Sequence, residues 1–246
     1  MAAVPNTFAS IVANFAEFLT VAIHTIIWER GIYPDTSFIK AKKYNSPVRQ
    51  SRHPKVCEFI LAAVDAVREQ LLKGTLQQVC LVIYSPLLQA LERFVFDVSK
   101  FPVVPKEDHL TQLEREGAAP STILPVDLEE QFRAALTRLT GCGTRLSPLP
   151  PDCTFNVAIE VRDEADPPIG HPQPWIPTQP SLQRRAGTYG DDGYDDRLGS
   201  DLGGVSLTPI RAIDAGELVF EMWVEEGEGK REAVLNLSQT STQLSD

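Results

Sequence analysis

The sequence predicts an α+β protein in which a largely antiparallel sheet is covered by helices on one side. One reason is the order of its expected elements, because most strands follow one another through turns. A second reason is that segments 154–161 and 217–224 alternate strictly between apolar and polar residues, as half-buried strands do. Between them, residues 163–204 are rich in Pro, Gly and Asp. A connection this long is uncommon inside a compact domain and is usually functional or disordered.

The first helix is expected over residues 7–30 and is predicted to end at Gly31. Its apolar residues recur with the spacing of a helix that buries one wide face. They are Phe8, Ile11, Val12, Phe15, Phe18, Leu19, Ala22, Ile23, Ile26 and Ile27. Charged residues such as Glu17 and Glu29 interrupt the stretch, so we interpret it as a core helix and predict no membrane span.

Two helices and a hairpin are expected in the middle of the chain. Residues 33–48 should form a short hairpin or an irregular strand pair. A second helix should run from Pro54, a residue suited to the first helical position, to about Lys73. Strands 79–84 and 93–98 follow. The third helix is predicted to begin at Asp127, because Glu130 completes a capping box, and to end near Gly141 or Gly143.

The last two strands, 205–213 and 217–224, should form a hairpin that turns at Asp214-Ala215-Gly216. Its second strand turns Leu218, Phe220, Met222 and Val224 toward the core, which leaves Glu221 and Trp223 on the opposite face. In strand 154–161 the core-facing residues are Phe155, Val157, Ile159 and Val161.

The composition excludes several classes of function. A formal net charge of −10 argues against direct binding of nucleic acid, so we expect contact with DNA only through a partner. The four cysteines form no CxxC pair and there is no secretory signal, which indicates a reducing intracellular compartment. The basic run from Lys40 to Arg52 is either a solvated hairpin face or a local docking patch.

No motif predicts a catalytic residue, a metal site or a cofactor. The four histidines fall in different elements, and no phosphate-binding loop or nucleophile elbow is present. The acidic residues at 191–201 lack the spacing of a calcium loop, so we interpret them as a solvated stretch or a weak cation site. Trp175, flanked by prolines in the long connection, either anchors that connection to the body or helps to clamp a bound peptide.

Several strings, in order and spacing, resemble HORMA-domain proteins of the Mad-two-like branch, which includes the accessory subunit of DNA polymerase zeta. These strings are AEFLTVAIHTIIWERGIYP (16–34), KKYNSPV (42–48), HPKVCEFI (53–60), ERFVFDV (92–98), LEEQFRAAL (128–136), PPDCTFNVAIEVRDEA (150–165), PW (174–175) and MWVEE (222–226).

The resemblance implies a single HORMA domain over residues 1–226, with three helices and a core at about 8–162. It also implies a C-terminal segment, called the safety belt, over about residues 163–226, which closes over an extended partner peptide. We expect a disordered insertion at about 181–204 and a flexible tail at 227–246.

Candidate binding residues follow from the same resemblance. Phe59 and Trp175 are implied to contact the peptide, although membership of the core could also explain Phe59. Leu207, Glu221 and Trp223 correspond to the surface that relatives offer to a Y-family scaffold polymerase. Relatives commonly have Gln and Tyr at the positions of Glu221 and Trp223.

Lys40 and Arg133 correspond to a face used for pairing of HORMA domains, and ordinary solvated side chains are the alternative for both. The implied function is a nuclear, non-enzymatic adaptor in translesion DNA synthesis. It would clamp a proline-containing peptide of the catalytic subunit of DNA polymerase zeta and bridge it to the Y-family scaffold. Two alternatives are a spindle-checkpoint HORMA protein with another peptide and an enzyme with an unrecognised site in the long connection.

Overall fold

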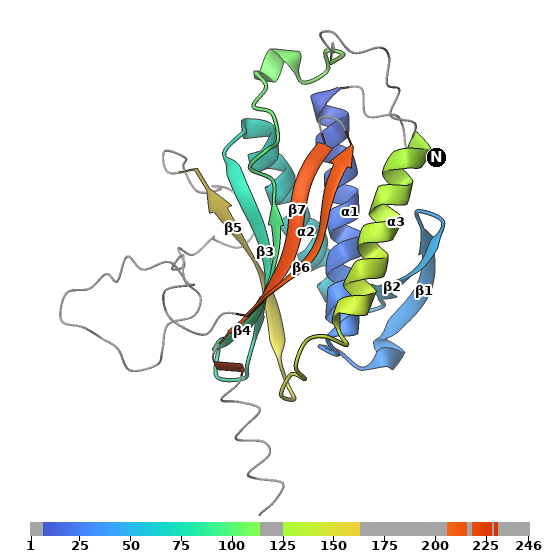
Figure 1. Ribbon diagram of the computed structural model, residues 1–246, viewed down its shortest axis with the longest axis vertical. Coiled ribbons are helices and arrows are strands. Elements are labelled where there is room, and N and C mark those ends of the chain that lie inside the picture. The colour runs from blue at the N-terminus through green and yellow to red at the C-terminus, as the bar shows by residue number, and fades with distance from the viewer. Residues whose placement is uncertain (1–6, 114–124, 163–205, 216–217, 228, 231–246) are drawn as a thin grey trace, which may run out of the picture.

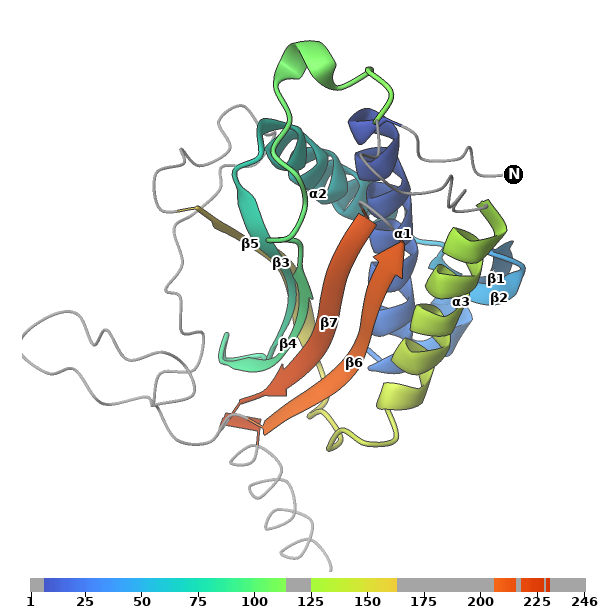
Figure 2. The same cartoon turned by 45° about the horizontal axis from the view of Figure 1, so that its top comes forward.

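The structure is a computed structural model that describes residues 7–113, 125–162, 206–215, 218–227 and 229–230. In this part of the chain, three α-helices lie against one face of a five-stranded sheet, and a two-stranded hairpin lies beside the helices (Figures 1 and 2). All strand pairings in these residues are antiparallel. The predicted α+β class and the antiparallel sheet are confirmed.

Helix α1 (Phe8–Glu29) is the central helix, and every residue of its predicted apolar stripe is buried. The Thr7 side chain caps its first turn by accepting a hydrogen bond from the Ser10 amide. The chain leaves the helix through Arg30 and Gly31, whose φ of 62° is in the left-handed region that glycine adopts readily. By length and composition α1 could span a membrane, but 72% of its most apolar window is buried inside the domain.

Helix α2 (Pro54–Lys73) begins at the predicted proline and ends at Gly74, which has a φ of 69°. A Cβ atom at Gly74 would lie 2.7 Å from Cγ1 of Val103, so both the backbone conformation and the space require glycine there. Helix α3 (Pro125–Cys142) begins two residues before the predicted Asp127, which makes the predicted cap position wrong. Proline is well suited to the first helical position, where its missing N–H would have no intrahelical partner.

The main sheet contains β3 (Leu76–Tyr84), β4 (Ala90–Asp97), β5 (Thr154–Val161), β6 (Ser206–Ala215) and β7 (Leu218–Glu226). Their order is β5-β3-β4-β7-β6, so the final hairpin pairs with β4 and not with β5, which precedes it in the chain. β3 and β4 each begin three residues earlier than predicted. The predicted turn residues Asp214 and Ala215 belong to β6 instead.

The separate hairpin consists of β1 (Phe38–Lys43) and β2 (Ser46–Ser51), which confirms the predicted strand pair and extends it by three residues. Tyr44 and Asn45 form the two-residue turn with φ values of 48° and 53°. Positive φ at both positions is typical of the tight turns that suit twisted strands. The Tyr44 ring is 5% exposed and packs 5.0 Å from the Phe132 ring, so it fixes the hairpin to α3.

The flexible tail was predicted to begin at residue 227, but the folded part of the chain continues beyond that residue. The Gly227 amide donates to the Leu91 carbonyl at 2.8 Å, and Lys230 is only 1% exposed. The folded domain therefore extends at least to Lys230. The predictions for residues 163–204, for the insertion and for residues 231–246 concern parts of the chain outside the described residues.

Candidate functional site

Strand β5 lies at one end of the sheet (Figure 1) and pairs only with β3 among the described strands. Its pairing runs from Thr154 opposite Tyr84 to Val161 opposite Leu76. The other edge of β5 therefore presents backbone N–H and C=O groups that no described strand satisfies. Such an edge is a template on which an extended chain can add as a further strand.

Three aromatic side chains gather beside this edge, and we call them the aromatic cluster: Tyr33, Phe59 and Phe155. The Phe155 ring lies 5.6 Å from Phe59 at 75° and 6.3 Å from Tyr33 at 83°, both edge-to-face. All three are half-buried, so part of each ring remains accessible. Burial raises the pKa of the Tyr33 hydroxyl above its ordinary value, so the cluster carries no charge at neutral pH.

The ends of the long connection lie at opposite edges of the sheet. β5 ends at Val161, and β6, the strand at the far edge, begins at Ser206. β5 and β6 are four inter-strand spacings apart, so the distance between them across the sheet is about 20 Å. Residues 163–204 can reach roughly 140 Å when extended. The connection is therefore long enough to pass around a strand added to β5. Trp175 lies within it, outside the described residues.

The three predicted scaffold-binding residues share the outer face of the final hairpin, which is the face away from the helices. Trp223 is opposite Pro209 in the β6–β7 register, Leu207 is opposite Glu225, and Glu221 is opposite Ala212. The Trp223 ring packs on a small apolar cluster of the outer sheet face, formed by Cys80, Val82, Ala90 and Val95. The predicted outward direction of Trp223 is therefore correct.

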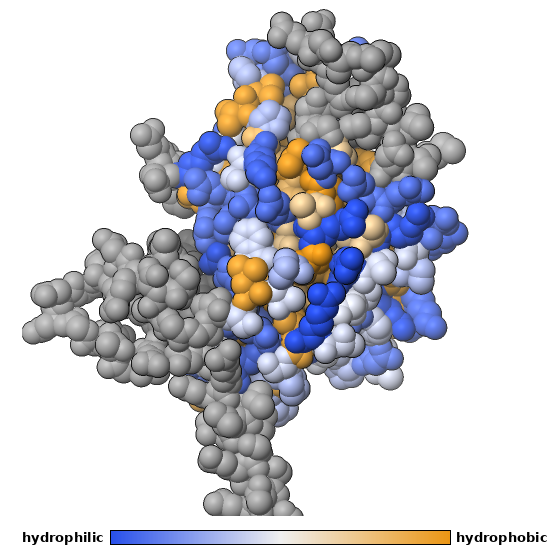
Figure 3. Space-filling view, in the orientation of Figure 1, coloured by the Kyte–Doolittle hydropathy of each residue, from blue (hydrophilic) through white to orange (hydrophobic). Residues whose placement is uncertain are grey.

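Leu207 is 58% exposed and is one of six exposed large apolar side chains in the described residues. Glu221 is exposed and forms an ion pair with Lys100 at 2.5 Å. On the face drawn in Figure 3, apolar residues form small patches separated by hydrophilic ones. A partner at the hairpin would therefore meet a small apolar contact with charged surroundings.

Lys40 and Arg133 line two neighbouring grooves along α3, the first facing the β1–β2 hairpin and the second facing β6. Lys40 lines a groove of about 430 Å³, and Arg133 lines one of about 910 Å³ that also includes Arg211 of β6. The two grooves share Ser46 and Thr137, so they form one continuous surface. The structure brings the two predicted residues to this surface, and their role in pairing stays a prediction.

Sequence reasoning missed two features of this arrangement. Tyr33 was not predicted to join Phe59 and Phe155, because a contact between three separate elements leaves no local pattern. The buried partners of Lys230 were also missed, although Glu92 shares the core-facing side of its strand with Phe94 and Phe96, which was a usable signal. Among the described residues, no group of three or more His, Cys, Asp or Glu side chains is placed to hold a metal ion.

Together, the fold and an edge of β5 that no described strand occupies define a domain able to accept an extended peptide strand. The chain belongs to the HORMA-domain family, because the HORMA domain pattern matches residues 12–184. It is 32% identical to the DNA polymerase zeta processivity subunit of Schizosaccharomyces pombe, over 86% of this chain and 91% of that protein. It is 34% identical to the mitotic spindle assembly checkpoint protein MAD2B of Danio rerio, over 64% of this chain and 69% of that protein. The predicted resemblance to this branch is confirmed.

Solved structures confirm the predicted HORMA fold. A chain of the mitotic checkpoint complex superposes with a TM-score of 0.65 at 20% identity and covers 90% of this chain and 97% of that one. C. elegans HTP-2 bound to a HIM-3 closure motif superposes with a TM-score of 0.55 at 18% identity. This match covers 90% of this chain and 92% of the HTP-2 chain. At these identities the likeness concerns the fold alone.

Proposed function

We propose that this protein is a non-enzymatic adaptor that captures an extended, proline-containing peptide of the DNA polymerase zeta catalytic subunit. The peptide would add to the edge of β5 that no described strand occupies, and residues 163–205 would enclose it. The observation that carries this proposal is the placement of β5 and β6 at opposite edges of the sheet. A relative of similar length is a polymerase zeta processivity subunit, which supports the choice of partner.

Capture at β5 combines two kinds of recognition. The backbone groups of β5 that no described strand satisfies would hydrogen-bond the peptide main chain and set its register. The aromatic cluster would receive apolar or proline side chains. Because the connection surrounds the peptide, release requires local opening of the β6–β7 hairpin. We therefore expect slow dissociation.

The outer face of the final hairpin is the proposed site for the Y-family scaffold polymerase, through Leu207, Glu221 and Trp223. This surface belongs to the strands farthest from β5 in the sheet order, so both partners would bind together. Trp223 is the expected anchor, since half-buried tryptophans at the centre of a patch often carry much of the binding energy. We place this activity in translesion DNA synthesis in the nucleus.

A second candidate is a checkpoint function, which the MAD2B relatives favour by their name. It would use the same edge for a kinetochore or anaphase-activator peptide. Isolation of the full chain from nuclear extract separates the two candidates: polymerase subunits support the first, and checkpoint proteins support the second.

The direct test compares Phe59→Ala with Leu61→Ala in calorimetric titrations with synthetic polymerase zeta peptides that contain proline. Phe59 belongs to the aromatic cluster, whereas Leu61 is on the same helix and 55% exposed. Phe59→Ala should weaken binding by about 2 kcal/mol, because it removes a ring from the peptide contact. Leu61→Ala should bind like the unchanged protein. Equal affinity of the two variants, or no binding by the unchanged protein, would refute the proposal.

A further inference from the structure

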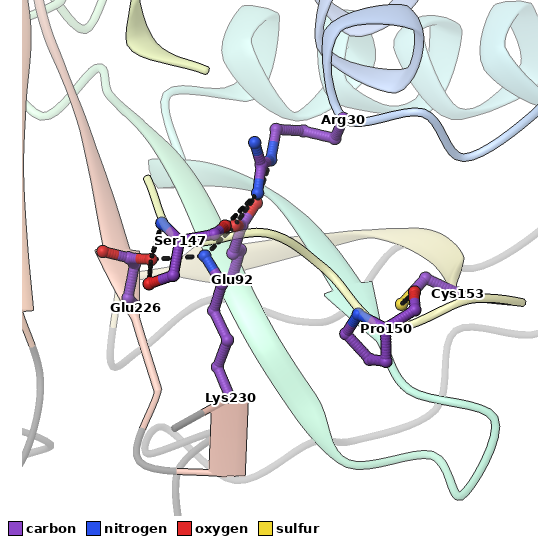
Figure 4. Close-up of polar contacts among 7 residues, drawn as sticks. All are labelled: Arg30, Glu92, Ser147, Pro150, Cys153, Glu226 and Lys230. Atoms are coloured by element: carbon purple, nitrogen blue, oxygen red, sulfur yellow. Dashed lines mark hydrogen bonds and ion pairs between the residues drawn. The ribbon is translucent and has the colours of Figure 1, made fainter. Parts of the chain in front are cut away.

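Four charged side chains meet in the interior where β7 ends (Figure 4), and we call them the charge cluster: Arg30, Glu92, Glu226 and Lys230. They come from the C-cap of α1, from β4, from the last residue of β7 and from the segment that follows it. The exposed fraction of the side chain is 6% for Arg30, 0% for Glu92, 1% for Lys230 and 14% for Glu226. Two positive and two negative charges balance within the cluster.

Each carboxylate in the cluster has several donors. Arg30 donates to both oxygens of Glu92, from Nε at 2.8 Å and from Nη2 at 2.6 Å. The Lys230 ammonium donates to Oε1 of Glu92 and to Oε1 of Glu226. Ser147 donates to the same oxygen of Glu226 from its amide at 3.1 Å and from its hydroxyl at 2.9 Å. Lys230 is therefore the cation that joins the two carboxylates.

The position of these carboxylates explains why a cation is needed between them. Glu92 and Glu226 are direct partners in the β4–β7 register. Like charges directly opposite one another destabilise an antiparallel pair, and withdrawal from water strengthens their repulsion. Burial by itself would raise the pKa of Glu226, but the bonds from Lys230 and Ser147 outweigh it and lower that pKa. The ionised carboxylate is thus the form that the folded cluster favours.

We propose that Lys230 is a positioning residue for the closed safety belt, which holds the end of the β6–β7 hairpin on β4 by neutralising Glu92 and Glu226. The clamp then includes residues beyond β7. Gly229 packs directly beside the side chain of Gln89 in the β3–β4 connection, which also brings this segment against β4. A hairpin that opens more often would also release a bound peptide faster. Only this consequence rests on the proposed function.

The test measures hydrogen exchange of the full chain without any ligand. Lys230→Met should speed exchange of the β6 and β7 amides by about 100-fold, since removal of one partner leaves an uncompensated buried charge. Amides of β3 and β5 should change by less than about threefold if opening is local. Lys230→Met combined with Glu226→Gln restores a neutral cluster and should recover most of the protection. Lys100→Met, which breaks the exposed pair with Glu221 of β7, is the matched control.

Several outcomes would overturn the proposal. One is a Lys230→Met variant whose β7 amides exchange no faster than those of Lys100→Met, and another is a double variant that recovers no protection. If Lys230→Met does not fold, folding of the double variant supports the proposal, and failure of both contradicts it. Because no peptide is present, this result is independent of whether the unchanged protein captures polymerase peptides.

Discussion

Strands β5 and β7 have the same alternating pattern in the sequence, but the structure covers their apolar faces differently. In β7, Leu218, Phe220, Met222 and Val224 are at most 2% exposed. In β5, only Val157 is buried, and Phe155, Ile159 and Val161 are half-buried. The same alternating pattern thus gives fully buried apolar side chains in β7 and mostly half-buried ones in β5. An apolar face that stays half-buried can gain further contact area when a partner chain binds beside it.

The neighbours of the two strands explain the difference. β7 lies between β4 and β6, and the Phe220 ring packs 5.1 Å from Phe15 and 5.5 Å from Phe18 of α1. β5 has a single described strand partner. We therefore expect substitutions of the core-facing residues of β7 to act on stability, and substitutions of the half-buried residues of β5 to act on peptide binding.

The largest expected effect tests this division directly. Phe220→Ala should lower the free energy of unfolding by about 3–5 kcal/mol, because it leaves a cavity among fully buried rings. Phe155→Ala, the same chemical change on β5, should lower it by only about 1–2 kcal/mol, since its ring is half-buried already. Urea denaturation of both variants measures the two losses. Equal losses would show that β5 is as completely packed as β7.

A somewhat smaller effect is expected at Trp175, in the connection between the two regions. If its ring becomes buried on the bound peptide, Trp175→Ala should weaken capture by about 2–4 kcal/mol while leaving stability close to that of the unchanged protein. Titration calorimetry with a polymerase zeta peptide measures the change, with Leu61→Ala as the control. A loss below about 0.5 kcal/mol would mean that Trp175 only anchors the connection and does not contact the peptide.

The alternation of β5 and β7 was enough to predict which side chains face the core, since the side-chain period of a strand is local. It could not predict that β7 would be interior and β5 at the edge, because strand order depends on pairing between distant segments. Local helix signals were equally informative, and both Pro54 and Gly31 mark ends that the structure confirms. The start of α3 was misplaced because Asp127 offered a cap signal and Pro125 a competing one.

Lys230 shows a different limit of sequence reasoning. The tail after β7 has no apolar periodicity, so nothing local indicates a buried side chain there. Its partner Glu92 is 138 positions earlier in the chain. Binding residues are limited in the same way: Phe59 was assigned through a resemblance, while its contact with Phe155 depends on the packing of α2 against β5.

The smallest expected effect is a difference between β7 and β5 in the pH at which their amides lose protection from hydrogen exchange. The pKa of Glu226 is lowered in the folded state from an ordinary value of 4.5, so its contribution to stability is complete above that value. The contribution is lost as the pH falls through the lowered pKa, because protonation removes the partner of Lys230.

Hydrogen exchange, corrected for its intrinsic pH dependence, should then show that, as the pH falls, the amides of β7 lose protection before those of β5. Glu226→Gln should abolish this difference and Glu221→Gln, on the same strand but exposed, should preserve it. Loss of protection at the same pH in both strands would mean that β7 depends on the charge cluster no more than β5 does.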